Sequence, residues 1–317
     1  MKILITGSKG VLGSYLSKML IDRGHDVFGV DLYHAPGEVG WEQEMSKGEF
    51  NYARCDVSNF RQLERVFEKA GPFDFVYHAA AEFGRWNGED YYEQLWLSNA
   101  VGTKNIIRLQ EKYKFKLIHF SSSEVYGDFD GIMKEDVMET TEIKQMNDYA
   151  MSKWVNEMQI RNSQIKHKTE TVVVRIFNTY GPGEWYHPYR SVNCKFCYHA
   201  LKGLPVVVYK GYFRTSTYLE DSCRTLANIV DNFKPGEIYN IGGLEYHSIE
   251  KLADLIWDYA GADRNLITYE GEEILTTKSK KVDIDKAVKD LDHKLTVPLE
   301  EGVKKTIDWM RQYYGIK

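Results

Sequence analysis

Short apolar runs recur through the first 180 positions of the chain, and stretches with helical periodicity separate them. The runs lie at residues 2–6, 25–30, 51–55, 73–78, 116–120 and 171–177. The first run has no polar break after Lys2, which is typical of a strand buried on both faces of a sheet. Strands that alternate with helices in this way predict an α/β fold with a doubly wound parallel sheet.

Helical periodicity follows the first apolar run and recurs in three later segments. Ser58 or Asn59 can cap the first of these, and Asn147 or Asp148 can cap the last. The middle one is predicted as one long helix over residues 89–113. Exposed loops are predicted where polar sequence intervenes, at residues 32–50 and 128–147.

Three glycines separate the first predicted strand from the first helix. Gly7, Gly10 and Gly13 are three residues apart, and the helix begins between them with Val11 and Leu12. In such a turn one glycine bends the chain, one lets the backbone approach a pyrophosphate and one lets the helix pack closely on the strand. The free N–H groups and positive dipole end of the helix then point at that pyrophosphate. This pattern predicts a dinucleotide site rather than a merely structural turn.

The second apolar run ends on Asp31, eighteen residues after Gly13. A carboxylate at this strand end can accept hydrogen bonds from both ribose hydroxyls, and it would repel a 2′-phosphate. Lys9 favours NADP more weakly, because a basic side chain near the ribose can pair with a phosphate. Asp31 has the better defined position, so NAD is the predicted cofactor.

After residue 180 the alternation of strands and helices loosens. Short strands are predicted at 205–209 and 237–241, and helices at 283–291 and 299–313 close the chain. We therefore divide the sequence into an NAD-binding Rossmann domain, residues 1–179, and a smaller mixed region, residues 180–317, that mostly binds substrate.

Composition argues against other classes of function. The chain has 317 residues, 43% of them hydrophobic and 27% charged, which is ordinary for a globular protein. The net charge of −5 argues against a nucleic-acid partner, and no apolar stretch is long enough to span a membrane. The first strand begins at Lys2 and leaves no room for a signal peptide, so a cytoplasmic protein is expected.

Cys194 and Cys197 have the spacing of a metal or redox pair. The sequence offers them no second pair and no nearby histidine at ligand spacing. We therefore predict that they are structural residues on a helix face, and we predict no metal site.

Tyr149 and Lys153 are four residues apart and share one face of the helix that follows Asn147. A phenol is a poor base near neutral pH, since its reference pKa is about 10. A nearby ammonium group and the positive nicotinamide of NAD would favour the phenolate and make Tyr149 a general base. Lys153 can also hold the nicotinamide ribose, and Ser122, after the fifth run, can bond the same substrate oxygen. These three residues are the predicted catalytic group.

With these residues in place, the chain resembles the extended short-chain dehydrogenases/reductases of the nucleotide-sugar epimerase/dehydratase family. The resemblance covers nearly the whole chain, and further motifs carry it at residues 6–13, 56–57, 78–80, 99–103, 121–127, 149–153 and 175–182. It implies an NAD-dependent enzyme that oxidises a nucleotide-diphospho-sugar at C4.

The resemblance also assigns roles to residues that no local pattern explains. It implies that Asp56 and Val57 touch adenine, that Asn178 faces the substrate and that Arg214 grips the diphosphate. Asn99 is expected to belong to the cofactor site. So are the small residues Ala79, Ala80 and Ala81, which would let the cofactor approach closely, although plain packing is the alternative.

The resemblance further implies a homodimer, in which helices near 89–113 and 148–165 of two protomers form a four-helix interface. Both segments carry apolar residues that one sheet face need not cover, namely Leu95, Leu97, Trp154, Val155 and Met158.

Ser123 and Glu124 occupy a place where members of the family differ. dTDP-glucose dehydratases carry an Asp-Glu pair there, whereas Ser-Glu is similar to GDP-mannose 4,6-dehydratases and UDP-glucuronate decarboxylases. A glutamate beside a sugar oxidised at C4 could remove the acidic C5 proton and drive loss of water from C6. The alternative is a carboxylate that accepts bonds from the loop backbone.

One stretch departs from the family pattern. Many relatives have an Arg-x-Gly-Asp stretch near the C-terminus that supplies a second diphosphate contact. Here residues 270–273 are Glu-Gly-Glu-Glu, followed by Lys278, Lys280 and Lys281. The nucleotide-binding details are therefore expected to differ in this chain.

The leading hypothesis is NAD-dependent oxidation at C4 with a 4,6-dehydratase-type outcome. Release of the ketone by a C4 dehydrogenase, 4-epimerisation and decarboxylation stay open as alternatives. A non-catalytic NAD-binding sensor is a different class, and it would be expected to have lost Tyr149 or Lys153, which are both present.

Overall fold

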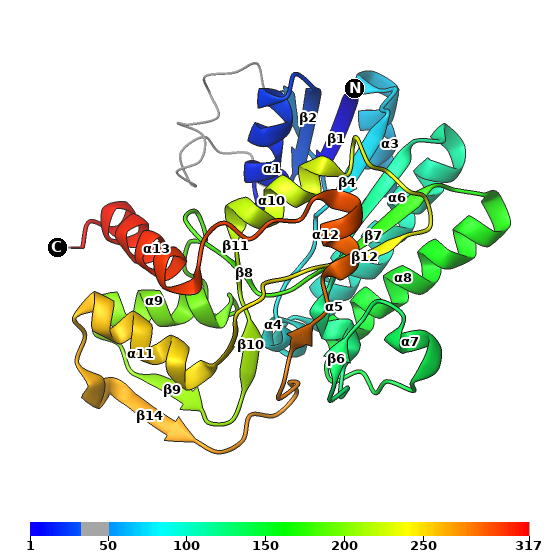
Figure 1. Ribbon diagram of the computed structural model, residues 1–317. Coiled ribbons are helices and arrows are strands. Elements are labelled where there is room, and N and C mark those ends of the chain that lie inside the picture. The colour runs from blue at the N-terminus through cyan, green and yellow to red at the C-terminus, as the bar shows by residue number, and fades with distance from the viewer. Residues whose placement is uncertain (33–50, 317) are drawn as a thin grey trace.

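A computed structural model describes residues 1–32 and 51–316 of the chain (Figure 1). The loop predicted at 32–50 lies, apart from Leu32, outside the described residues. In the described part of the chain, no helix is both long and apolar enough to cross a membrane.

Seven parallel strands form one central sheet in the order β12-β7-β5-β4-β1-β2-β3. The strands are β1 Lys2–Thr6, β2 Asp26–Asp31, β3 Asn51–Arg54, β4 Phe75–His78, β5 Lys116–Ser122, β7 Thr171–Ile176 and β12 Ile238–Ile241. The predicted doubly wound parallel sheet is confirmed, and the six predicted strands of the first 180 residues all belong to it.

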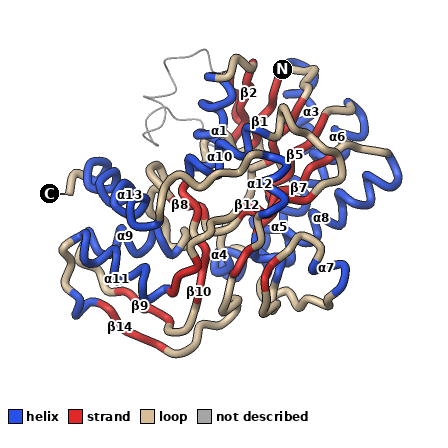
Figure 2. Tube along the Cα trace, viewed as in Figure 1, coloured by secondary structure: helices blue, strands red, loops and turns tan. Residues whose placement is uncertain are grey.

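Helices cover both faces of this sheet (Figures 1 and 2). Ile3 and Ile5 of β1 pack under one face and Leu4 under the other, as a strand buried on both sides requires. One face is covered by α1 Val11–Asp22, α10 Leu219–Asn228 and α12 Asp285–Leu291, and the other by α3 Phe60–Ala70, α6 Gly102–Tyr113 and α8 Asp148–His167.

Two of the predicted helix caps are confirmed. The Asn59 side chain accepts a hydrogen bond from the Gln62 amide, 3.2 Å away, at the start of α3. The Asn147 side chain accepts one from the Ala150 amide, 2.8 Å away, at the start of α8. The second cap fixes where α8 begins, and therefore where Tyr149 and Lys153 lie on it.

The prediction of one unbroken helix over 89–113 is wrong. The chain forms α4 Arg85–Asp90, α5 Tyr92–Trp96, a π-helical turn over Leu97–Val101 and then α6. The wide turn directs the buried Asn99 side chain toward Glu82, whose backbone it bonds twice, and toward the Ser152 hydroxyl, 3.0 Å away. Helical periodicity alone does not reveal such an insertion.

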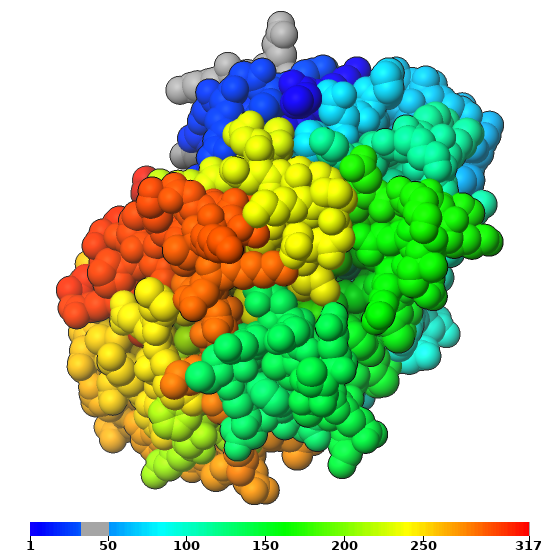
Figure 3. Space-filling view, turned by 45° about the vertical axis from the view of Figure 1, so that its right-hand side comes forward, coloured from blue at the N-terminus to red at the C-terminus, as the bar shows by residue number. Residues whose placement is uncertain are grey.

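The prediction that 128–147 is an exposed loop is wrong in part, because this segment contains β6 Ile132–Met133 and α7 Val137–Thr140. β6 pairs in parallel with β15 Lys281–Val282 from the far end of the sequence. In the space-filling view, the orange residues near the C-terminus accordingly lie against the green segment that carries β6 and α7 (Figure 3).

A smaller part with its own hydrophobic core lies beside the carboxyl ends of the strands (Figure 2). Its main elements are α9 Val192–Lys202, β9 Val206–Tyr209, α11 Ile249–Ala260, β14 Ile267–Glu270 and α13 Leu299–Tyr314. Short strand pairs border it: β8 Thr179–Tyr180 with β11 Thr217–Tyr218, and β10 Phe213–Thr215 with β13 Tyr246–Ser248. The predicted closing helices correspond to α12 and α13.

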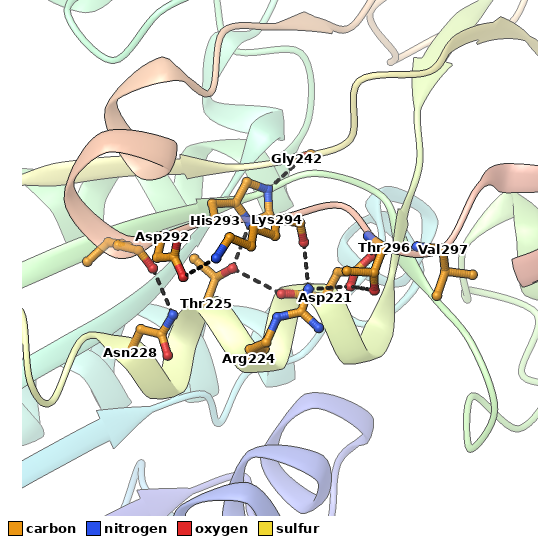
Figure 4. A network of polar contacts seen from close by, with 11 residues as sticks. Asp221, Arg224, Thr225, Asn228, Gly242, Asp292, His293, Lys294, Thr296 and Val297 are labelled. Atoms are coloured by element: carbon orange, nitrogen blue, oxygen red, sulfur yellow. Dashed lines mark hydrogen bonds and ion pairs between the residues drawn. The ribbon is translucent and has the colours of Figure 1, made fainter.

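The chain passes between the two parts more than once, since β12, α10 and α12 come after residue 180 and pack with the main sheet. A polar network at the N-terminus of α10 joins the parts (Figure 4). The fully buried Asp221 carboxylate accepts bonds from the amides of Thr296 and Val297, at 2.8 and 3.2 Å, in the segment that leads into α13. The division at residue 179 stays a prediction.

Candidate active site

A cavity of about 1160 Å³ opens at the carboxyl ends of the parallel strands, between the sheet and the smaller part. Open α/β sheets bind their ligands at this edge, where the strand order reverses. The reversal here lies between β1 and β4. Residues from both parts of the chain line the cavity, so a ligand would contact both.

The glycine turn at one end of the cavity fits a dinucleotide. Gly7 has a φ of +71°, and a Cβ on Gly13 would lie 2.1 Å from the Gly7 carbonyl oxygen, so side chains are excluded here. No side chain caps the start of α1 at Gly10. The turn and the first α1 residues, Val11 and Leu12, line the cavity and leave helix-terminal N–H groups for a pyrophosphate.

Asp31 lines the cavity at the end of β2, as predicted. Its carboxylate accepts hydrogen bonds from the backbone amides of Lys9, at 2.9 Å, and Leu32, at 2.7 Å, and so joins the glycine turn to the strand end. The Lys9 ammonium lies 4.7 Å from the ring centre of Tyr52. Asp31 thus lies at the strand end where the sequence predicted it, and its contact with the ribose stays a prediction.

Replacing Asp31 with alanine should weaken NAD binding and relax the discrimination against NADP. The change removes the ribose hydrogen bonds and the repulsion of a 2′-phosphate. Calorimetric titration of cofactor-free protein with both dinucleotides measures this. Unchanged affinities for both would contradict the role of Asp31. Asp26→Ala, an exposed aspartate at the start of the same strand, is the matched control.

The remaining cofactor residues differ in what their side chains do. Val57, Ala79, Ala80 and Ala81 line the cavity, and a Cβ on Gly7 would already lie 2.7 Å from the Ala80 nitrogen. The Asp56 carboxylate instead binds the amide and hydroxyl of Ser58, at 2.8 and 2.7 Å. Asn99 holds the Glu82 backbone. Direct cofactor contacts of Asp56 and Asn99 stay predictions.

Ser122, Tyr149 and Lys153 come together at the centre of the cavity. Ser122 ends β5, while Tyr149 and Lys153 lie on successive turns of α8. The Lys153 ammonium donates to the Phe120 carbonyl, 2.9 Å away, and lies 5.8 Å from the ring centre of Tyr149. The structure thus brings together the three residues predicted as the catalytic group.

A buried network behind these residues positions them. Both Glu157 on α8 and Arg175 on β7 are almost fully buried, and the guanidinium donates to the carboxylate at 2.8 and 3.1 Å. The Ser121 hydroxyl donates to the same carboxylate at 2.5 Å. Because an unpaired buried charge is costly, this network holds α8 and the end of β5 in one arrangement.

Burial shifts the pKa values of both Tyr149 and Lys153. Burial raises the pKa of Tyr149 to about 12, although a hydrogen bond with Ser122 acts in the opposite direction. Burial also lowers the pKa of Lys153 to about 8, against the attraction of Glu157. The chain alone therefore holds Tyr149 as a neutral phenol, and Lys153 is not enough to ionise it.

Glu124 lies in the same cavity and is held by Lys280, whose contact with it no sequence pattern indicated. Its carboxylate forms an ion pair with the Lys280 ammonium through Oε1, while the buried Oε2 has no partner among residues 1–32 and 51–316. Burial raises the pKa of Glu124, but the charges of Lys280, Arg214 and Arg85 outweigh it, so the net pKa lies below its usual range. Glu124 is an anion with one oxygen available.

The cavity also contains a buried arginine. Arg214 is buried and lines it together with Asn178. The Arg214 guanidinium donates to the carbonyls of Phe213 and Lys278, at 2.8 and 3.1 Å, and to the Thr276 hydroxyl, at 3.2 Å. Burial lowers its pKa to about 10, which still leaves it charged at neutral pH. Arg214 is thus a cation in the cavity, and its role in binding a diphosphate stays a prediction.

The departure at residues 270–273 has a structural counterpart. Glu273 forms an ion pair with Arg85, the first residue of α4. Arg85 and Glu273 both line the cavity, as does Lys195 on α9. Arg85 is a cation that sequence reasoning missed, because its partner is 188 residues away.

Cys194 and Cys197 are fully buried on α9, which confirms their place on a helix. Burial is the main cause that raises the pKa of both thiols. Among residues 1–32 and 51–316, no group of three or more histidine, cysteine or acidic side chains could hold a metal ion.

Comparison with known proteins agrees with this geometry. The model of the family described as the NAD dependent epimerase/dehydratase family matches residues 3–242. The chain belongs to this family. NAD is accordingly its cofactor, and binding of NAD at the glycine turn, residues 7–13, stays a prediction.

Two relatives within this epimerase/dehydratase group match nearly the whole chain. A dTDP-glucose 4,6-dehydratase from Salmonella typhimurium is 28% identical over 340 residues, which cover 98% of this chain and 92% of the relative. A UDP-N-acetyl-alpha-D-glucosaminuronate decarboxylase from Bacillus cytotoxicus is 29% identical over 322 residues, with 98% of both chains covered.

The solved UDP-glucuronic acid 4-epimerase from Bacillus cereus, in complex with UDP-glucuronic acid and NAD, has a similar structure. Its TM-score is 0.88 at 26% identity, with 99% of this chain and 100% of that chain covered. The similarity extends through the smaller part as well as the sheet.

Proposed function

We propose that this enzyme oxidises a nucleotide-diphospho-sugar at C4 and then eliminates water from C5 and C6, as a 4,6-dehydratase. The observation that carries this proposal is Glu124, an ionised carboxylate in the same cavity as Ser122 and Tyr149, with an unpartnered oxygen. A C4 ketone acidifies the neighbouring C5 proton, and a carboxylate in this cavity is the group that can remove it.

Each catalytic residue has a separate task in this proposal. Tyr149 takes the proton of the C4 hydroxyl, and Ser122, bonded to the phenol, keeps the substrate oxygen aligned. Bound NAD accepts the C4 hydrogen and adds a positive charge that favours the phenolate. Lys153 holds the nicotinamide ribose.

The cationic end of the cavity determines how the substrate lies. Arg214, Arg85 and Lys195 form a positive region suited to a diphosphate, and a guanidinium can bind two phosphate oxygens at once. With the cofactor on the glycine turn and the diphosphate on these cations, the sugar lies beside Tyr149 and Glu124, which line the same cavity. Two of the relatives named above act on nucleotide sugars, which supports this substrate class.

Decarboxylation of a nucleotide-linked hexuronate is the second candidate. Lys280 is a cation beside Glu124 that could hold a substrate carboxylate, and one relative is a decarboxylase of this kind. Epimerisation at C4 and release of the C4 ketone are further possible outcomes of the same first step.

Incubation with UDP-, dTDP-, GDP- and CDP-sugars, with products analysed by mass spectrometry, tests the proposal. Loss of water supports the dehydratase. Loss of carbon dioxide means decarboxylation, loss of two hydrogens means simple oxidation, and an isomer of unchanged mass means epimerisation. Any of the last three would overturn the dehydratase proposal.

We also propose a homodimer formed through the surface of α5, the following π turn and α8. Leu97, Val101, Met151 and Met158 are apolar side chains with 37–47% of their surface exposed there. The prediction that Leu95 is left uncovered is wrong, because it is fully buried within the protomer. A cytoplasmic location stays a prediction.

The dimer should have twice the protomer mass in light scattering at micromolar concentration. Met158→Glu places a charge in the proposed interface and should shift the protein to monomer. Leu244→Glu, at an apolar residue 71% exposed and outside that surface, is the matched control and should leave the mass unchanged. A monomeric wild type would contradict the proposal.

A further inference from the structure

A buried lysine lies beside the predicted base of the elimination step. Lys280 is only 2% exposed, its ammonium pairs with Glu124, and its Nζ lies 3.5 Å from the Ser123 hydroxyl. It also lines the cavity. Burying a lysine ammonium without a partner is costly. Its pairing with Glu124 therefore gives Lys280 a defined electrostatic environment in the cavity.

The backbone around Lys280 is fixed rather than loose. Its amide donates to the Phe213 carbonyl at 3.1 Å, and its carbonyl accepts from the Thr215 hydroxyl at 3.4 Å. The next two residues form β15, which pairs with β6. Thr277 donates to the Gly127 carbonyl at 2.5 Å, directly after the 3₁₀ helix Ser123–Tyr126 that carries Glu124. The strand pairing and these bonds fix Lys280 and Glu124 relative to each other.

The proposed elimination needs an acid as well as a base. Hydroxide is a poor leaving group, so the C6 oxygen needs a proton as its bond to carbon breaks. Tyr149 is committed to the C4 oxygen, and a serine hydroxyl such as that of Ser123 is too weak an acid. Lys280 is the group paired with Glu124 that carries a transferable proton.

We propose that Lys280 is the general acid that protonates the departing C6 oxygen while Glu124 removes the C5 proton. This inference rests on the proposed dehydratase function. The C5–H electron pair becomes the C5=C6 double bond, and the C6–O bond breaks with its electron pair on oxygen. That oxygen takes the Lys280 proton and leaves as water.

The two residues restore themselves after this step. Before it, the pair holds one proton, on Lys280. After it, the pair again holds one proton, now on Glu124, which received it from C5. Their direct hydrogen bond lets that proton cross back to the amine and regenerate the ion pair. Glu124 can act on C5 through its other oxygen, Oε2, which has no partner.

The electrostatics suit both roles. Burial lowers the pKa of Lys280 to about 8, although the attraction of Glu124 raises it and Arg214 adds to the lowering. A proton donor with a pKa close to the working pH is charged at rest and still gives up its proton readily. Glu124 stays ionised and ready to accept one.

Two substitutions of Lys280 separate an acid from a merely positioning charge. Lys280→Met removes the proton donor, and Lys280→Arg keeps the ion pair with Glu124 but cannot release its proton. With the nucleotide sugar that the wild type dehydrates, both variants should eliminate water from the sugar more slowly, by a factor on the order of 10². Oxidation at C4 and exchange of the C5 proton with solvent deuterium should continue. Lys281→Met, at the exposed neighbouring residue, is the matched control.

The 6-deoxy-6-fluoro analogue of the same sugar gives the decisive measurement. Fluoride leaves with much less need of a proton, so both variants should release it at rates within a few-fold of the wild type. Equal slowing of the fluoro analogue and the natural sugar would overturn the proposal. A variant that loses both C5 exchange and dehydration would also overturn it, and so would dehydration at the wild-type rate by Lys280→Arg. The same holds if the wild type decarboxylates a hexuronate and Lys280 serves to hold its carboxylate. If the wild-type enzyme dehydrates none of the sugars, the proposed function fails. This inference then fails with it, before any variant is compared.

Discussion

Replacing Tyr149 with phenylalanine should slow oxidation of the sugar by a factor on the order of 10²–10⁴, because the change removes the general base. The phenol lines the cavity, forms a hydrogen bond with Ser122 and has the Lys153 ammonium 5.8 Å from its ring centre. The aromatic ring itself is kept, so packing at the start of α8 should be preserved. NAD affinity should change little, since the glycine turn and Asp31 are untouched.

Single-turnover kinetics of nicotinamide reduction measures this loss, and calorimetry measures NAD binding in the same variant. Tyr113→Phe, on the partly exposed end of α6, is a matched control that should leave both unchanged. Near-wild-type oxidation by Tyr149→Phe would show that another group takes the proton, and the catalytic assignment would be wrong.

Replacing Glu124 with glutamine should arrest the reaction after oxidation. Ser122, Tyr149 and Lys153 are untouched, so the first step should proceed, while elimination should slow by a factor on the order of 10²–10³. The amide oxygen can still accept from Lys280, so the loop should keep its shape. The absorbance of reduced nicotinamide should therefore rise and fail to decay, with a 4-keto sugar accumulating.

Solvent deuterium provides an independent test of the same residue. The wild type should incorporate the label at C5, whereas Glu124→Gln should not. Glu139→Gln, at an exposed glutamate on α7, is the matched control. If the wild type stops at the ketone and exchanges no C5 proton, Glu124 is structural and the enzyme is a C4 dehydrogenase.

The sequence by itself determined the features that arise from local spacing. Ile3 and Ile5 point to one face of the sheet and Leu4 to the other, which depends only on the pleat of one strand. The helix caps at Asn59 and Asn147 depend on hydrogen bonds from amides three residues away. The glycine turn is equally local. Tyr149 and Lys153 meet because a helix places residues four apart on one face.

Only the tertiary structure decided the features that join distant segments. Lys280 and Glu124 form an ion pair although they are 156 residues apart in the sequence. Glu273 and Arg85 pair although they are 188 residues apart, and neither pair leaves a periodic signal in the sequence. β12 joins the main sheet for the same reason, since its partner β7 lies more than 60 residues earlier. The charges at the proposed elimination site depend on such a contact. The Glu124 carboxylate and the Lys280 ammonium are each costly to bury alone, and they are stable together only because the fold brings them into one cavity.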